Sequence, residues 1–117
     1  MERTLALVQG IYFVCTGLWP IFSIGTFQVV TGPKPDLWLV KTAGILISAI
    51  GAALTVAGLQ HEVTPALVTL GAGSAAGLAG IDLNYGLKRV ISPVYLADAV
   101  LELLLVACWG LAWFDVV

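Results

Sequence analysis

Charge is scarce in this chain of 117 residues. Lys, Arg, Asp and Glu together make up 10% of the sequence, and there is a single His. Five basic residues against seven acidic ones, without a basic run, exclude nucleic acid as a partner. A lone His provides no metal-ligand cluster, and the sequence contains no cofactor motif and no recognisable nucleophile. We therefore expect no metal site, no cofactor and no catalytic residue.

Cysteine is also rare, and its placement argues against a cross-link. Cys15 falls near the middle of the first apolar stretch and Cys108 near the end of the last. Their expected depths in a membrane differ by several ångströms, which is too far apart for a disulfide. We expect both to be small buried apolar side chains.

Apolar residues, by contrast, are abundant and make up 60% of the sequence. A soluble domain of this size would leave about 40% of its unfolded surface exposed, so it could not hide so many apolar side chains. The sequence therefore predicts an integral membrane protein that folds in lipid.

The uncharged stretches divide into segments long enough to cross a bilayer, which takes about 20 residues in a helix. The predicted spans are residues 5–22, 37–58, 65–85 and 93–113. Residues 23–35 are predicted to form an interfacial segment and a loop, because their uncharged part is too short to cross.

Helix-boundary signals accompany these spans. Asp36 is predicted to cap the second span, and Thr64 and Ser92, each followed by proline, the third and the fourth. Gly86 is predicted to end the third span, and Pro20 to kink or end the first.

Short connections between consecutive spans force neighbouring helices to run antiparallel. The predicted fold is all-α: an antiparallel bundle of four transmembrane helices that forms one membrane domain over residues 1–117. Lys34, Lys88 and Arg89 lie in the first and third connections, whereas Arg3 stands alone on the other side. The positive-inside rule then places both termini outside the cytoplasm.

Small residues recur at helical spacing on two of the spans. Those on the second span are Gly44, Ser48, Gly51, Thr55 and Gly58. On the third span, Gly73 and Gly77 form a small-xxx-small pair. Such faces let helix backbones approach closely in lipid. We expect packing within the chain, with a homo-oligomer as the alternative.

Each span also carries one polar stripe, and these stripes give the candidate site. The residues are Gln9, Tyr12 and Trp19 on the first span, Lys41 on the second, Asp82 on the third, and Tyr95, Asp98 and Glu102 on the fourth. Lipid offers no hydrogen-bond partners, so the stripes are expected to face one another around an interior polar pocket. Hydrogen bonding that only fixes helix pairing is the alternative role of these groups.

Depth follows from the rise of 1.5 Å per residue in a helix. By that rise, Lys41, Asp82 and Asp98 each lie about 6–8 Å inside the same membrane face, and Glu102 lies about 13 Å inside. An unpaired charge at such depth costs a few kcal/mol or more. We therefore predict that Lys41 pairs with Asp82 or Asp98, while Glu102 stays protonated.

Two segments, Val29-Val-Thr-Gly-Pro-Lys-Pro-Asp-Leu-Trp-Leu-Val40 and Pro93-Val-Tyr-Leu-Ala-Asp-Ala99 with Glu102, bear a resemblance to known sequences. They resemble segments of small, uncharacterised bacterial four-helix integral membrane proteins. The resemblance implies the same four-helix membrane fold and a location in the bacterial inner membrane, and it brings no activity with it.

Three functions remain open. In the first, the pocket binds or transports a small amphipathic or lipid-like ligand, with Lys41 holding an anionic or carbonyl group and Asp98 and Glu102 holding a cation or proton. In the second, the chain is an accessory or assembly subunit of a larger membrane complex. In the third, it is an intramembrane enzyme that uses paired carboxyl groups for acid-base chemistry on a lipid. Membrane lipid is the expected surrounding partner in all three.

Overall fold

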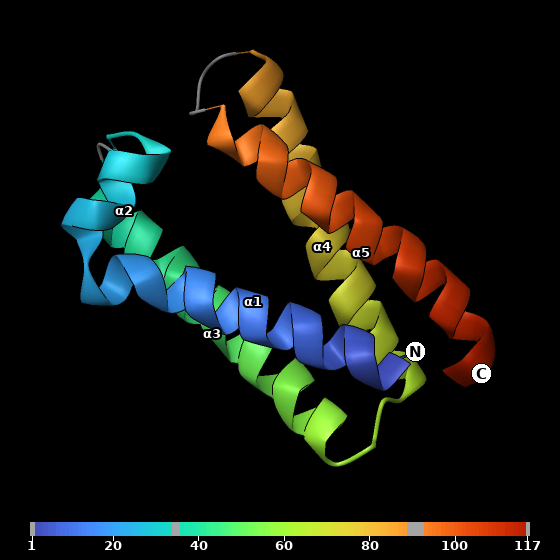
Figure 1. The fold of residues 1–117 in the computed structure, drawn as a ribbon. Coiled ribbons are helices and arrows are strands. Elements are labelled where there is room, and N and C mark those ends of the chain that lie inside the picture. Colours follow the sequence, from blue (N-terminus) through green and yellow to red (C-terminus); the bar gives the residue numbers. More distant parts are fainter. Residues whose placement is uncertain (1, 34–35, 89–92, 117) are drawn as a thin grey trace.

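The computed structural model describes residues 2–33, 36–88 and 93–116. Within them the chain forms helices and no strand (Figure 1). The helices are α1 (Glu2–Phe22), α2 (Ile24–Thr31), α3 (Leu37–Leu59), α4 (Pro65–Leu87) and α5 (Val94–Val116). The prediction of an all-α helical bundle is confirmed.

The four long helices, α1, α3, α4 and α5, are long and apolar enough to cross a membrane. Each has 21 to 23 residues, or about 32–35 Å at 1.5 Å per residue, against a hydrocarbon core of about 30 Å. No more than 33% of the apolar stretch of any of them is buried inside the protein. Large side chains such as Phe22 and Phe114 are more than 80% exposed. An outer surface of this kind is stable against acyl chains and not against water.

Helix α2 is the short apolar segment that follows the first span. Its eight residues cannot cross a bilayer. It ends at Gly32, whose φ of 93° lies in a region that glycine adopts without strain. Helix α2 lies beside the end of α1 (Figure 1).

The structure confirms one of the predicted helix caps but not all of them. The Thr64 hydroxyl accepts a hydrogen bond from the backbone N–H of Leu67 at 3.3 Å, so the predicted cap of α4 is confirmed. Asp36 occupies the capping position of α3, but its side chain makes no capping hydrogen bond. The predicted cap at Ser92 lies outside the described residues, as do Lys34 and Arg89.

Gly86 does not end the third span as predicted, because α4 continues through it to Leu87. A Cβ atom at Gly86 would lie 2.7 Å from Leu96 Cδ2 of α5. The missing side chain therefore serves contact between α4 and α5 at this position and not helix termination.

Helices α1 and α3 pack with their backbones nearly touching. A Cβ atom at Gly51 would lie 2.6 Å from the carbonyl oxygen of Gly10, and one at Gly17 would lie 2.5 Å from the carbonyl oxygen of Gly44. Both distances are shorter than any real contact of a Cβ atom, so only glycine fits. The small-residue face of the second span thus packs within the chain, as expected.

Arg3 joins the same two helices at their other end. Its Nε donates a hydrogen bond of 2.8 Å to the carbonyl oxygen of Gly58, in the last turn of α3. A cation at a helix C-terminus also interacts favourably with the helix dipole. The start of α1 is thereby fixed to the end of α3.

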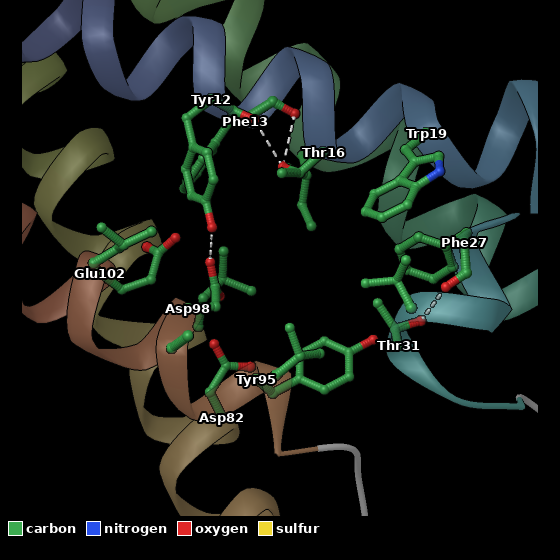
Figure 2. Close-up of a pocket in the computed structure, with 16 residues that line it drawn as sticks. Tyr12, Phe13, Thr16, Trp19, Phe27, Thr31, Asp82, Tyr95, Asp98 and Glu102 are labelled. Atoms are coloured by element: carbon green, nitrogen blue, oxygen red, sulfur yellow. Dashed lines mark hydrogen bonds between the residues drawn. The ribbon is translucent and has the colours of Figure 1, made fainter.

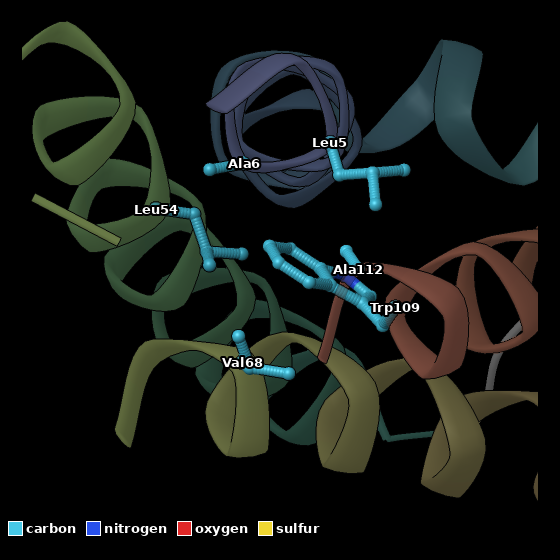
Figure 3. Packing of buried hydrophobic residues seen from close by; sticks show 6 residues of the cluster. All are labelled: Leu5, Ala6, Leu54, Val68, Trp109 and Ala112. Carbon is cyan, nitrogen blue, oxygen red and sulfur yellow. The ribbon is translucent and has the colours of Figure 1, made fainter. Parts of the chain in front are cut away.

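Helix α4 pairs with α5 through contacts of a different kind, in which side chains of α5 lie against glycines of α4. The indole ring of Trp109 on α5 lies against Gly71 of α4, where a Cβ atom would be 2.8 Å from Trp109 Cε2. The two helix pairs meet near the start of α1 and spread apart toward α2 and the end of α4 (Figure 1). Buried apolar side chains from all four long helices close the end where the pairs meet (Figure 3): Leu5, Ala6, Leu54, Val68, Trp109 and Ala112.

Candidate functional site

A cavity of about 340 Å³ lies between the two helix pairs, bordered also by α2. Figure 2 shows its labelled residues arranged around the space, with α1 on one side, α4 and α5 on another, and α2 closing a third. The polar and aromatic residues that line it are Tyr12, Phe13, Thr16, Trp19, Phe27, Thr31, Asp82, Tyr95, Asp98 and Glu102.

Three carboxyl groups line one part of this cavity. Asp98 and Glu102 are four residues apart on α5 and therefore share a helix face, and Asp82 joins them from α4 (Figure 2). Asp82 is only 5% exposed and Glu102 only 1% exposed. Asp82 Oδ2 and Glu102 Oε2 are buried without a hydrogen-bond partner.

Tyr12 connects the acidic cluster to α1. Its hydroxyl donates a hydrogen bond to Asp98 Oδ1 across the cavity (Figure 2). One turn further along α1, the Thr16 hydroxyl donates to the carbonyl oxygen of Tyr12 at 2.8 Å. The hydroxyl proton of Thr16 therefore stays within its own helix.

Aromatic rings form the opposite wall, where α1 meets α2. The rings of Trp19 and Phe27 are 5.3 Å apart in a T-shaped arrangement, a preferred geometry for aromatic pairs. Trp19 Nε1 donates to Thr26 Oγ1 at 3.0 Å, and the Thr31 hydroxyl donates to the carbonyl oxygen of Phe27 at 2.7 Å. This wall is apolar toward the cavity because its polar atoms bond elsewhere.

Lys41 lies elsewhere than the sequence predicts. It is exposed on α3 and is not among the residues that line the cavity. Helix α1 covers the small-residue face of α3 that follows Lys41. At the N-terminal end of α3, where Lys41 lies, α1 and α3 are far from α4 and α5 (Figure 1). The expected pairing of Lys41 with Asp82 or Asp98 therefore does not form, and the carboxyl cluster lacks its predicted counter-ion.

Gln9 points inward, as predicted, but it serves a different contact. Its Nε2 donates to the carbonyl oxygen of Gly71 at 2.9 Å, and its Oε1 accepts from Trp109 Nε1 at 2.6 Å. Both side chains are fully buried. Gln9 thus fastens α1 to α4 and α5 at the closed end of the bundle and does not line the cavity.

Of the predicted site residues, the structure brings six together around the cavity: Tyr12, Trp19, Asp82, Tyr95, Asp98 and Glu102. The sequence interpretation missed Phe27 and Thr31, which α2 contributes. They are four residues apart, so they lie on one face of this short helix. That spacing was the available signal, and it becomes informative only once residues 24–31 are known to be helical.

The described part of the chain contains no group of three His, Cys, Asp or Glu side chains placed to hold a metal ion. Comparison with protein-family models, with curated proteins and with solved structures gives no match. Fold and site together define the class: an α-helical bundle with four helices able to span a membrane and an acid-lined cavity between its helix pairs.

Proposed function

We propose that this protein binds or transports a small amphipathic or lipid-like molecule in the cavity between its helix pairs. The supporting observation is the combination of about 340 Å³ of space with two buried carboxyl oxygens that have no partner, Asp82 Oδ2 and Glu102 Oε2. A purely structural polar cluster in a membrane protein would pair its groups with one another, since an unpaired one is costly. Side chains that line a cavity and keep a buried oxygen without a partner fit a site that a ligand completes.

The shape of the cavity fits the proposal. Mostly apolar lining with a few convergent polar groups is typical of small-molecule sites. Val30 of α2 and Val94 of α5 line the cavity and are both partly exposed at the protein surface. A molecule dissolved in the membrane would therefore reach the cavity sideways, past α2. We further propose the bacterial inner membrane as the location, with both termini outside the cytoplasm.

A matched pair of variants tests whether the cavity holds a ligand. Thr16→Phe places a ring in the cavity, whereas Thr69→Phe makes the same change at an exposed position of α4 away from it. We expect native mass spectrometry of the protein, extracted gently from its membrane, to detect a bound small amphipathic molecule with the wild type and with Thr69→Phe. Thr16→Phe is expected to lose it.

Thermal unfolding measures the same binding. A ligand at about a hundred times its Kd stabilises a folded protein by about 2.7 kcal/mol. We expect Thr16→Phe to lose that increment and Thr69→Phe to keep it. Equal occupancy and equal stabilisation in the two variants would contradict a ligand site in this cavity.

A second function, as a subunit of a larger membrane complex, is favoured by a separate observation on α4. Gly73, Gly77 and Gly80 lie on its exposed surface, and a Cβ atom at any of them would meet nothing within 4 Å. In lipid, a small-residue face of this kind packs closely against another helix. A transmembrane helix of a different subunit would cover it.

Substitution on this face tests the subunit hypothesis. We expect Gly77→Leu to release the chain from its complex, as measured by the mass of the particle in mild detergent. Gly110→Leu is the control, because Gly110 on α5 is equally open but lies outside the α4 face. If the wild type already migrates as a lone monomer, the subunit function fails.

A further inference from the structure

We propose that the ligand of the cavity carries an ammonium head group on a short apolar body, so that it is a lipophilic amine. This inference rests on the proposed ligand-binding function and specifies the chemistry of its ligand.

The protein uses most of its own hydrogen-bond donors at this site. The Tyr12 hydroxyl donates to Asp98, the Thr16 hydroxyl to a carbonyl of its own helix, and Trp19 Nε1 to Thr26. The Thr31 hydroxyl also donates to a carbonyl of its own helix. Among the residues that the structure describes, the buried side-chain atoms without partners are carboxyl oxygens, Asp82 Oδ2 and Glu102 Oε2. An ionised carboxyl group is an acceptor only, so a ligand that completes the ionised site must bring donors, and an ammonium group brings up to three.

The charge of the lining residues also favours a cationic ligand. Three carboxyl groups line the cavity, and none of the described residues that line it is basic. Lys41, the cation expected there, is exposed on α3. An anionic head group would add repulsion to this cluster, whereas a cation would neutralise carboxylates that are otherwise costly at this depth.

The arrangement of the carboxyl groups favours an organic cation over a metal ion. They do not converge closely enough to form a metal site within the described residues. The aromatic rings of Trp19, Phe27 and Tyr95 line the same cavity. Aromatic faces attract ammonium groups through cation–π interactions, and they also provide an apolar surface for the body of the ligand.

The volume limits how large that body is. Sites for small molecules span about 300–1,000 Å³, so a cavity of about 340 Å³ lies at the lower end. A complete phospholipid with two acyl chains is too large to be enclosed. An amine with one short chain fits, with its tail directed toward the partly exposed Val30 and Val94.

Binding of such a cation is coupled to protons. The titratable groups that face the cavity are Tyr12 of α1, Asp82 of α4, and Tyr95, Asp98 and Glu102 of α5, whereas α2 and α3 contribute none among their described lining residues. Without a ligand, protonation is the means by which buried carboxyl groups avoid unpaired charge. An entering ammonium ion replaces that proton, which leaves to solvent. Raising the pH therefore strengthens ammonium binding.

The test compares ligands that share one tail and differ in head group. Octylamine, 1-octanol and octanoate are titrated into the full chain in lipid nanodiscs, with binding measured by calorimetry against empty nanodiscs. An alkylammonium keeps its proton below about pH 10. We expect octylamine to bind at least about tenfold more tightly than 1-octanol and octanoate not to bind. The affinity for octylamine is expected to rise between about pH 5 and pH 8, with proton release.

Two neutral isosteres and a control locate the effect. Glu102→Gln and Asp82→Asn are each expected to reduce octylamine affinity about tenfold. Each is also expected to weaken the pH dependence of octylamine binding and to leave 1-octanol binding unchanged. That unchanged binding also shows that the variants fold. Glu62→Gln makes the same change at an exposed loop position and is expected to leave both ligands unaffected.

The outcomes separate this inference from the function on which it rests. If 1-octanol or octanoate binds as tightly as octylamine and Thr16→Phe blocks that binding, the cavity is a ligand site but the ammonium assignment is wrong. If none of the three binds in a manner that Thr16→Phe blocks, both the inference and the ligand-binding function are overturned. Equal octylamine affinity in wild type, Glu102→Gln and Asp82→Asn also overturns the inference.

Discussion

Gly51→Ala is expected to lower the free energy of unfolding by about 1–3 kcal/mol, although it adds a single methyl group. The new Cβ atom would lie 2.6 Å from the carbonyl oxygen of Gly10 and 2.7 Å from the backbone N of Val14. Backbone atoms cannot rotate away as a flexible side chain can, so α1 and α3 must separate. Helix association in lipid relies on such close packing, and separation forfeits dispersion contacts along the whole interface.

Gly77→Ala is the matched control for this prediction. It makes the same change in α4, where a Cβ atom would meet nothing within 4 Å. Alanine favours a helix over glycine by about 1 kcal/mol, so the variant is expected to be as stable as the wild type or slightly more stable. The stability of the two variants is measured by titration with a denaturing detergent, with circular dichroism reporting the loss of helix. An equal loss of stability at the two positions would show that the contact between α1 and α3 is not as close as described.

Gln9→Leu is expected to destabilise the bundle by about 1–3 kcal/mol, because it leaves a buried donor without an acceptor. Leucine has a similar volume, so the change removes hydrogen bonds more than packing. Trp109 Nε1 loses its acceptor Gln9 Oε1, and the carbonyl oxygen of Gly71 loses one of its donors. The end at which the two helix pairs meet is then held by apolar contacts alone.

A double-mutant cycle isolates the hydrogen bond between Gln9 and Trp109. Trp109→Phe removes the indole N–H, so in the double variant neither partner is left unpaired. We expect the double variant to be less destabilised than the sum of the single variants by about 0.5–3 kcal/mol. Trp113→Phe, one turn further along α5 at a side chain 38% exposed, is expected to change stability by less than about 0.5 kcal/mol. Strict additivity in the cycle would refute the coupling.

The contact between Gln9 and Trp109 also bears on the candidate site. It joins α1 to α5 at the end where the two helix pairs meet, and the cavity lies between the pairs where they spread apart. Motion of the pairs about this contact would widen or narrow the cavity. Gln9→Leu therefore perturbs a contact between the helix pairs without altering any residue that lines the cavity.

The sequence by itself determined the fold class and most of the acidic site. Apolar stretches of helical length, with charge confined to a few positions, leave a chain in lipid no alternative to spanning helices. Helical spacing alone places Asp98 and Glu102 on one face, and depth counted from the helix ends places Asp82 at nearly the same level. These arguments need only local geometry.

Tertiary structure decided which faces meet, and so the charge of the cavity. The glycine face of α3 packs on α1, and Lys41 is exposed while the carboxyl groups stay inside. The polar stripe of α1 divides, with Gln9 fastening the closed end and Tyr12 and Trp19 lining the cavity. Periodicity reports that a residue lies on a face but not which helix covers that face, because pairing depends on how closely whole backbones approach. That choice replaced an expected ion pair with an acidic cavity without a counter-ion among its described lining residues.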